Sequence, residues 1–230
     1  MVPRELVSTA LGFLHRSVRA GFVGHRPNQL PEDAVPRLRA AIEAALDAAM
    51  AAGKDATSPS ARFILVTALA EGADRLAATA ALARAWQIEA PLPFSITRYA
   101  QDFTGGESLS EFEALVRQAA KVIPAPKNDA DPEAGYIAAG QAVIRNADFA
   151  FIAWNGEEGK GAGGTADVGA QALEAGIPVI WIGVAERQRT KLILPADAVA
   201  QKGARAAYLR GALAARFERT ERPAALVSAA

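Results

Sequence analysis

The sequence contains no cysteine and only two histidines, His15 and His25. Without cysteine, the chain has no disulfide bond, no thiolate metal site and no cysteine nucleophile. Two histidines also fall short of the imidazole ligands that a histidine-rich metal site needs. We therefore expect neither a metal ion nor another cofactor.

The chain also lacks net charge and long apolar runs. It carries 25 basic and 25 acidic side chains, whereas a protein that binds duplex DNA normally has a basic surface. This balance argues against nucleic acid as a partner. No apolar run approaches the length of a membrane span, and residues 1–5 lack the pattern of a secretory signal. We expect a soluble, cytoplasmic protein that does not contact a membrane.

Several catalytic motifs are missing. The sequence has no G-x-S-x-G elbow, no zincin helix and no G-x-x-x-x-G-K-[ST] loop, so a nucleophile-based hydrolase is unsupported. Gly159, Gly161 and Gly164 do fit G-x-G-x-x-G. That motif belongs to a tight turn after a first strand, whereas these glycines lie in a long loop late in the chain. A dinucleotide-dependent dehydrogenase is therefore not favoured.

Apolar runs alternate with helical patterns along most of the chain. The predicted strands are residues 18–23, 63–66, 88–94, 121–123, 149–154 and 178–182. Helical patterns lie between them, at about 32–53, 74–86, 109–119, 133–145 and 165–175. We expect the third strand to be broken by its prolines and the first helix to end at Gly53. The alternation predicts a doubly wound, Rossmann-like α/β fold, with a mainly parallel sheet between two layers of helices.

We expect one such domain over residues 17–185, preceded by a lead-in of residues 1–16. Residues 186–230 form a C-terminal tail, in which 204–219 has a helical pattern. Its apolar residues recur at every fourth position: Leu209, Leu213 and Phe217. Such a face predicts that the tail packs on the domain or on a partner subunit.

Three polar clusters each follow a predicted strand. The first is Gly24-His25-Arg26. Glycine allows a tight turn and a close backbone approach, and the arginine fork suits phosphate or carboxylate. The histidine is a candidate to donate a hydrogen bond to a ligand or to stack on a base.

The second cluster contains Glu71, Gly72, Asp74 and Arg75. Glu71 is a candidate for binding a ribose hydroxyl or for general base catalysis. Asp74 is suited either to cap the following helix or to face a ribose. For Arg75 we expect a salt bridge to Asp74 or Glu71.

The third cluster is Gly163-Gly164-Thr165, which precedes a predicted helix. Its backbone N–H groups and the helix N-terminus form a candidate anion site, and Thr165 is a natural N-cap. Tyr99 and Trp154 are candidates to pack beside a base. Because the carboxyl ends of parallel strands share one edge, the clusters predict a common pocket there for a nucleotide-like anion.

The same three clusters resemble the SLOG superfamily. Residues 65–77 are similar to its S-G-x-A-x-G-x-D segment, residues 24–26 to its first-strand turn, and residues 163–167 to its Gly-Gly-Thr loop. The superfamily includes DNA-processing protein A, the Lonely-guy (lysine-decarboxylase-like) phosphoribohydrolases and stand-alone sensor domains. The resemblance covers about residues 17–183 and implies a Rossmann-like fold, nucleotide binding and a homodimer.

The third cluster departs from the Lonely-guy pattern P-G-G-x-G-T-x-x-E. Val168 stands where the glutamate is expected, and Asp167 lies one position early, a rotation of about 100° on a helix. Three hypotheses remain open. The first is a sensor that binds a nucleotide or an ADP-ribose-like molecule. The second is a phosphoribohydrolase with Glu71 or Asp167 as its acid, and the third is single-stranded nucleic-acid binding.

Overall fold

The computed structural model describes residues 17–103, 105–124, 131–157, 163–185 and 188–193. Seven strands form one sheet. They are β1 (Ser17–Gly24), β2 (Arg62–Val66), β3 (Gln87–Leu92), β4 (Lys121–Pro124), β5 (Phe149–Trp154), β6 (Val179–Gly183) and β7 (Lys191–Ile193). Their order is β4-β3-β2-β1-β5-β6-β7, and all pairs are parallel except β6 with β7. The predicted Rossmann-like fold is confirmed.

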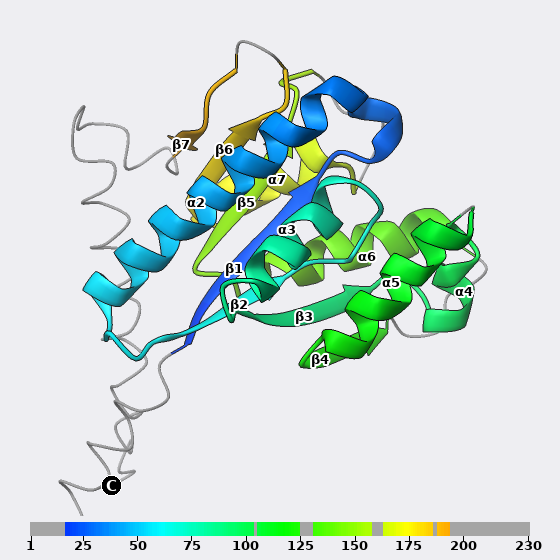
Figure 1. The fold of residues 1–230 in the computed structure, drawn as a ribbon, viewed down its shortest axis with the longest axis horizontal. Coiled ribbons are helices and arrows are strands. Elements are labelled where there is room, and N and C mark those ends of the chain that lie inside the picture. The colour runs from blue at the N-terminus through cyan, green and yellow to red at the C-terminus, as the bar shows by residue number, and fades with distance from the viewer. Residues whose placement is uncertain (1–16, 104, 125–130, 158–162, 186–187, 194–230) are drawn as a thin grey trace, which may run out of the picture.

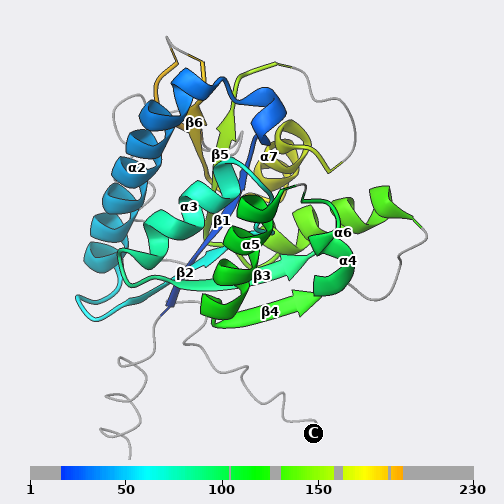
Figure 2. The same ribbon diagram turned by 45° about the vertical axis from the view of Figure 1, so that its right-hand side comes forward.

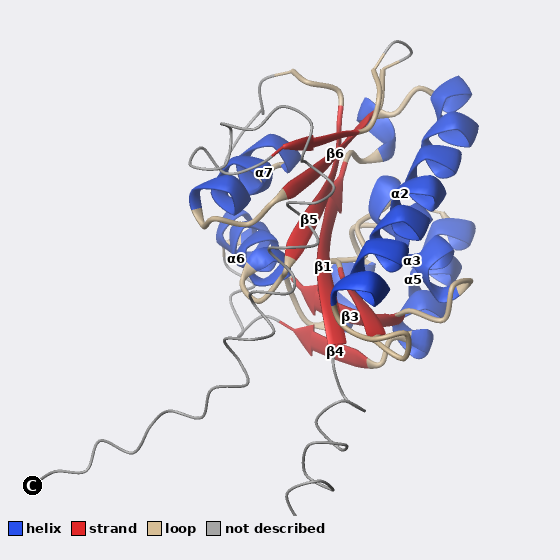
Figure 3. Ribbon diagram, turned by 90° about the vertical axis from the view of Figure 1, so that its left-hand side faces the viewer, coloured by secondary structure: helices blue, strands red, loops and turns tan. Residues whose placement is uncertain are grey.

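Six α-helices connect the described strands. They are α2 (Val35–Ala56), α3 (Ala73–Leu82), α4 (Ile96–Ala100), α5 (Gly106–Gln118), α6 (Pro132–Ile144) and α7 (Thr165–Glu174), with two short 3-10 helices, η1 (Pro27–Gln29) and η2 (Glu32–Ala34), before α2. Helices α2, α3 and α5 cover one face of the sheet, and α6 and α7 cover the other (Figures 1 and 3). None of the helices in the described ranges is both long enough and apolar enough to span a membrane.

The chain reverses its direction of travel across the sheet between β1 and β5. Strands β2 to β4 lie on one side of β1, and the chain then returns through α6 to place β5 on the other side. In such folds a crevice opens at the carboxyl ends of the two central strands. The first and third polar clusters follow these two strands, so the topology brings them to this edge.

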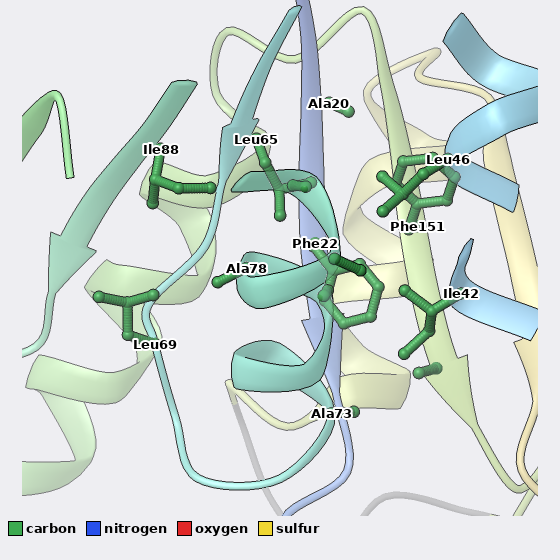
Figure 4. Close-up of a cluster of buried hydrophobic side chains, with 14 of the residues drawn as sticks. Ala20, Phe22, Ile42, Leu46, Leu65, Leu69, Ala73, Ala78, Ile88 and Phe151 are labelled. Atoms are coloured by element: carbon green, nitrogen blue, oxygen red, sulfur yellow. The ribbon is translucent and has the colours of Figure 1, made fainter. Parts of the chain in front are cut away.

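The larger part of the core lies between the sheet and helices α2 and α3. Phe22 and Phe151 project from the two central strands toward Ile42 and Leu46 of α2 (Figure 4). Helix α3 buries five alanines against this layer: Ala73, Ala77, Ala78, Ala80 and Ala81. Such small side chains let a helix lie close to its neighbours, and this close packing fixes the position of the α3 N-terminus beside the end of β1.

Several local predictions were wrong. Strand β3 runs through Pro91, because it pairs with β2 only as far as Glu89, so the missing proline N–H interrupts no bond of that ladder. Helix α2 continues past Gly53 to Ala56. The stretch between the third strand and the next predicted helix, where no helix was predicted, contains α4, whose N-cap Ser95 accepts a hydrogen bond from the N–H of Arg98. Strand β7 was not predicted, and it extends the sheet beyond the expected domain boundary at residue 185. Residues 1–16 and 204–219 lie outside the described ranges.

Candidate functional site

A cavity of about 180 Å³ lies at the carboxyl ends of the central strands. The residues that line it come from the end of β1, the segments that follow β1 and β2, the loop before α7, and helices α3, α4, α6 and α7. They are Val23, Gly24, Arg26, Gln29, Ala68, Ala70, Asp74, Tyr99, Tyr136, Ala139, Gly140, Val143, Gly163, Gly164 and Thr165. Members of all three predicted clusters therefore share one cavity, although not every member of each cluster reaches it.

Gly24 ends β1 where three elements converge. A Cβ atom at this position would lie 2.5 Å from the Cβ of Ala73 and 2.9 Å from the Cβ of Ala153. Both neighbours are completely buried, so neither has room to move. Only glycine lets the N-terminus of α3 and the end of β5 close around the turn after β1.

Arg26 is the one cation among the described residues that line the cavity. Its side chain is half-buried, and its guanidinium lies over the ring of Tyr136 at 5.0 Å from the ring centroid. The Tyr136 hydroxyl donates to Asp102, and Asp102 pairs with Arg98 at 2.7 Å. Figure 2 shows α4 beside α6, the two helices that bring this network together. The packing restricts Arg26 to one region of the cavity wall.

Asp74 is buried, and both of its carboxyl oxygens are occupied. Oδ1 accepts the backbone N–H of Gly24 at 2.8 Å, and Oδ2 accepts the hydroxyl of Thr67 at 3.0 Å. Burial raises its pKa to about 7, against the opposing effect of these hydrogen bonds and of Arg26. Asp74 thus joins α3 to the ends of β1 and β2. It does not cap α3, because the N-cap residue is Gly72 and no side chain caps that helix.

The N-terminus of α7 opens into the same cavity. Gly164 is its N-cap, with no side chain capping the helix, so the prediction that Thr165 is the N-cap was wrong. The N–H of Val168 bonds to the carbonyl of Gly164, whereas the N–H groups of the first turn precede any intrahelical partner. These groups and the positive end of the helix dipole favour a negatively charged ligand.

Asp167 does not line the cavity. Its Oδ2 atom accepts the backbone N–H of Gly163 at 2.7 Å and the side-chain amide of Gln171 at 2.9 Å. These bonds hold the glycine loop against the first turn of α7. Asp167 therefore stabilises the glycine loop. This agrees with its position in the sequence, one residue before the place where the Lonely-guy pattern has its glutamate.

His25 lies beneath the cavity wall and does not line it. Its backbone carbonyl accepts from Ala73 at 3.0 Å, and its ring atom Nε2 accepts from the N–H of Asn155 at 3.1 Å. The ring is buried at 4 % exposure, and Nδ1 has no partner among the described residues. His25 therefore connects the turn after β1 to both α3 and the loop after β5.

Glu71 and Gly72 also lie outside this cavity. Gly72 has φ of +101°, and a Cβ there would come within 2.6 Å of the carbonyl oxygen of His25, so its role is a close backbone contact. Glu71 faces a different, more open hollow that it shares with the start of α5. The turn directs it outward because Leu69 and Asp74 occupy the buried positions on either side.

Arg75 is buried at 1 % exposure. The predicted salt bridge to Asp74 or Glu71 is wrong, because Arg75 pairs with Glu111 instead. Its Nη1 atom donates to the carbonyl of Ser108 at 2.7 Å and lies 3.2 Å from the carboxylate of Glu111. The guanidinium also lies 4.2 Å from the centre of the Phe103 ring. Arg75 thus anchors α5 to α3.

The two predicted aromatic residues have different positions. Tyr99 lines the cavity but is buried at 1 % exposure among the rings of Phe94, Phe103 and Phe112, and this burial raises its pKa. Trp154 lies on the opposite side of α7. Its ring packs against Trp181 with centroids 5.9 Å apart, and its N–H donates to the carbonyl of Glu157.

The prediction from sequence missed the contribution of α6. This helix supplies Tyr136, Ala139, Gly140 and Val143 to the cavity. Its closely spaced small residues are a signal that could have pointed to a helix that approaches another segment. The identity of that segment depended on the crossover that places α6 next to β1, and the sequence did not reveal it.

The fold and site define a Rossmann-like α/β protein with an anion-suited cavity at the switch point of its sheet. A comparison with protein-family models gives no match, and no curated protein matches the sequence. Among the solved structures to which the chain is similar in fold are the following two. One is DNA processing protein A (DprA) from Streptococcus pneumoniae, with 14 % identity and a TM-score of 0.46 over 75 % of this chain and 52 % of that chain. This chain therefore spans about half the length of that protein. The other is TM1055, with 15 % identity and a TM-score of 0.40 over 72 % of each chain.

Proposed function

We propose that this protein binds a nucleotide or a nucleotide-derived small molecule through its phosphate group. The observation that carries the proposal is the shared cavity of Arg26 and the α7 N-terminus. Arg26 supplies a fixed planar cation, and the N-cap and first residue of α7 supply N–H donors at Gly164 and Thr165. A guanidinium and a helix N-terminus that face one space suit a phosphoryl group.

The size of the cavity limits what it can hold. Sites that enclose drug-sized ligands usually measure about 300–1,000 Å³, whereas this cavity measures about 180 Å³. We expect it to take the phosphate and part of the sugar, while the base extends out of the cavity. Gln29 offers a polar group beside Arg26 for sugar hydroxyls.

The arrangement supports binding rather than hydrolysis of an N-glycosidic bond. Asp74 is the one carboxyl group among the described residues that line the cavity, and both of its oxygens already accept hydrogen bonds. Glu71 and Asp167, the candidate acids, are directed elsewhere. We therefore expect no release of adenine when the protein is incubated with AMP. Release that is abolished by Glu71→Gln would favour the phosphoribohydrolase hypothesis instead.

A thermal-shift panel tests the proposal, with AMP, ADP and ADP-ribose against adenosine and inorganic phosphate. A ligand present at a concentration of 100 times its Kd adds about 2.7 kcal/mol to the free energy of unfolding. This raises the Tm of a chain of this size by roughly 5–10 °C. We expect phosphorylated compounds to raise the Tm and adenosine to leave it unchanged.

Arg26→Gln should abolish the response, and Arg39→Gln is the matched control. Arg39 is an exposed arginine of α2, so its loss changes the net charge equally without touching the cavity. Equal responses to AMP and adenosine, or equal loss of binding in both variants, would overturn the proposal.

A further inference from the structure

A second hollow, separate from the first cavity, lies between α7 and strands β5 to β7. It measures about 180 Å³, and every residue that lines it is apolar. Trp154, Leu173, Trp181 and Ile193 form much of its surface. We refer to it as the α7 groove.

The tryptophans of the α7 groove present apolar rings because their N–H groups are already bonded. The indole of Trp154 donates to the carbonyl of Glu157, and that of Trp181 donates to the carbonyl of Trp154, each at 2.8 Å. Both residues are only half-buried. An apolar surface of this kind gains free energy when another apolar surface covers it, at about 25 cal/mol per Å².

Helix α7 has two apolar sides. Val168 and Ala172 are buried against the sheet. Ala166, Gly169, Ala170 and Leu173 line the groove, with spacings of three and four residues. Helices that pack on a single layer usually need one apolar stripe. Gly169 is buried, but Ala170 is exposed and Ala166 and Leu173 are only half-buried, so the described residues leave part of this second side uncovered.

The chain itself supplies a matching segment. Ile193 lines the α7 groove and is the last described residue, so residues 194–230 continue directly from it. Residues 204–219 carry Leu209, Leu213 and Phe217 at the spacing of one helix face. The ten residues that separate Ile193 from Ala204 span up to roughly 35 Å when extended, which allows the segment to return to the groove.

We propose that residues 204–219 bind as a helix in the α7 groove of the same chain, with Leu209, Leu213 and Phe217 against Trp154 and Trp181. A short tether gives the segment an effective concentration of about millimolar. Binding within one chain is therefore favoured over binding to a second copy at the micromolar concentrations of an assay.

The absence of cysteine allows the proposal to be tested by cross-linking in the full-length protein. Ala170→Cys places a thiol at the exposed rim of the groove, and Ala206→Cys places one in the tail at the N-terminal end of the predicted apolar face. As the matched control, Ala44→Cys replaces Ala170→Cys. Ala44 is an exposed alanine of α2, on the opposite face of the sheet.

We expect a short bis-maleimide to give an internally linked monomer with the 170–206 pair, at least about five-fold more than with the 44–206 pair. Leu213→Asp should reduce this yield to the control level and make tryptophan fluorescence more accessible to acrylamide. Ala215→Asp, on the other side of the predicted helix, should change neither measurement. Equal yields from both pairs would overturn the proposal. Covalent dimers in place of linked monomers would show that a second copy occupies the groove, and this too would overturn it.

Discussion

The carboxyl group of Asp74 accepts the backbone N–H of Gly24 at 2.8 Å, across fifty positions of sequence. This bond joins the first turn of α3 to the end of β1, directly beside the cavity. Asp74 therefore holds the second motif against the first, and it does so as a buried acid whose pKa lies at about 7.

The buried position of Asp74 predicts a dependence of stability on pH. Its pKa is about 7 in the folded protein and about 3.9 in the unfolded chain. Between these values the folded state holds more protons, so its stability falls as the pH rises through this range. Asp74→Asn imitates the protonated acid and should remove this contribution.

Urea unfolding at pH 5 and pH 8 measures the effect. From pH 5 to pH 8, the free energy of unfolding of the wild-type protein should fall by about 2–3 kcal/mol more than that of Asp74→Asn. Asp55→Asn, at an exposed position near the end of α2, serves as the control and should behave like the wild type. A parallel pH dependence in Asp74→Asn and the wild type would contradict the assignment.

The close contacts of Gly24 predict that alanine is not tolerated there. The added Cβ would clash with Ala73 and Ala153, and overpacking of this kind costs about 1–3 kcal/mol. Gly106→Ala is the matched control, because a Cβ at Gly106 meets no atom within 4 Å. Chemical denaturation should show a large loss for Gly24→Ala and little change for Gly106→Ala. Similar values for both would argue against the tight packing at the end of β1.

The buried guanidinium of Arg75 predicts an unequal effect of removing each partner of its ion pair. Arg75→Met leaves the carbonyls of Leu69 and Ser108 without their donor. This should lower the free energy of unfolding by about 2–3 kcal/mol. Glu111 is 48 % exposed, so Glu111→Gln should cost less than about 1 kcal/mol. Equilibrium unfolding of the two variants tests this, and equal losses would show that the ion pair, rather than the carbonyl bonds, dominates.

The network behind Arg26 predicts that Tyr136 affects ligand affinity without touching the phosphate itself. Tyr136→Phe keeps a ring beneath the guanidinium but removes the hydroxyl that bonds to Asp102. We expect the affinity for a phosphorylated ligand to fall roughly three- to ten-fold, equivalent to one lost hydrogen bond. Calorimetric titration provides the measurement, with Tyr136→Ala expected to lose more because the ring also disappears. A wild-type affinity in both variants would exclude Tyr136 as a positioning residue.

Much of the fold was predictable because the relevant signals are local. The continuous apolar runs of β2 and β5 and the four-residue spacing along α2 reflect burial on both faces of a strand or on one side of a helix. Short elements were missed. Strand β7 has only three residues, and α4 depends on a single cap at Ser95, so neither produces a clear periodic pattern.

The candidate site was predictable at the level of elements but not of individual side chains. Gly24, Arg26, Gly164 and Thr165 meet as expected because parallel strands end at one edge. Glu71 lies elsewhere because the turn after β2 uses its inward positions for Leu69 and Asp74. No local rule identifies which side chains of a turn will be buried.

The order of strands and helices, and the placement of polar clusters after strands, are determined by the sequence itself through hydrophobic periodicity and turn residues. The tertiary structure alone decides that β5 lies beside β1, that Tyr136 of α6 supports Arg26, and that His25 and Asp74 form hydrogen bonds that connect neighbouring elements. The physical reason is that these contacts join residues far apart in the chain. Their energies depend on the packing of whole layers, which no short segment encodes.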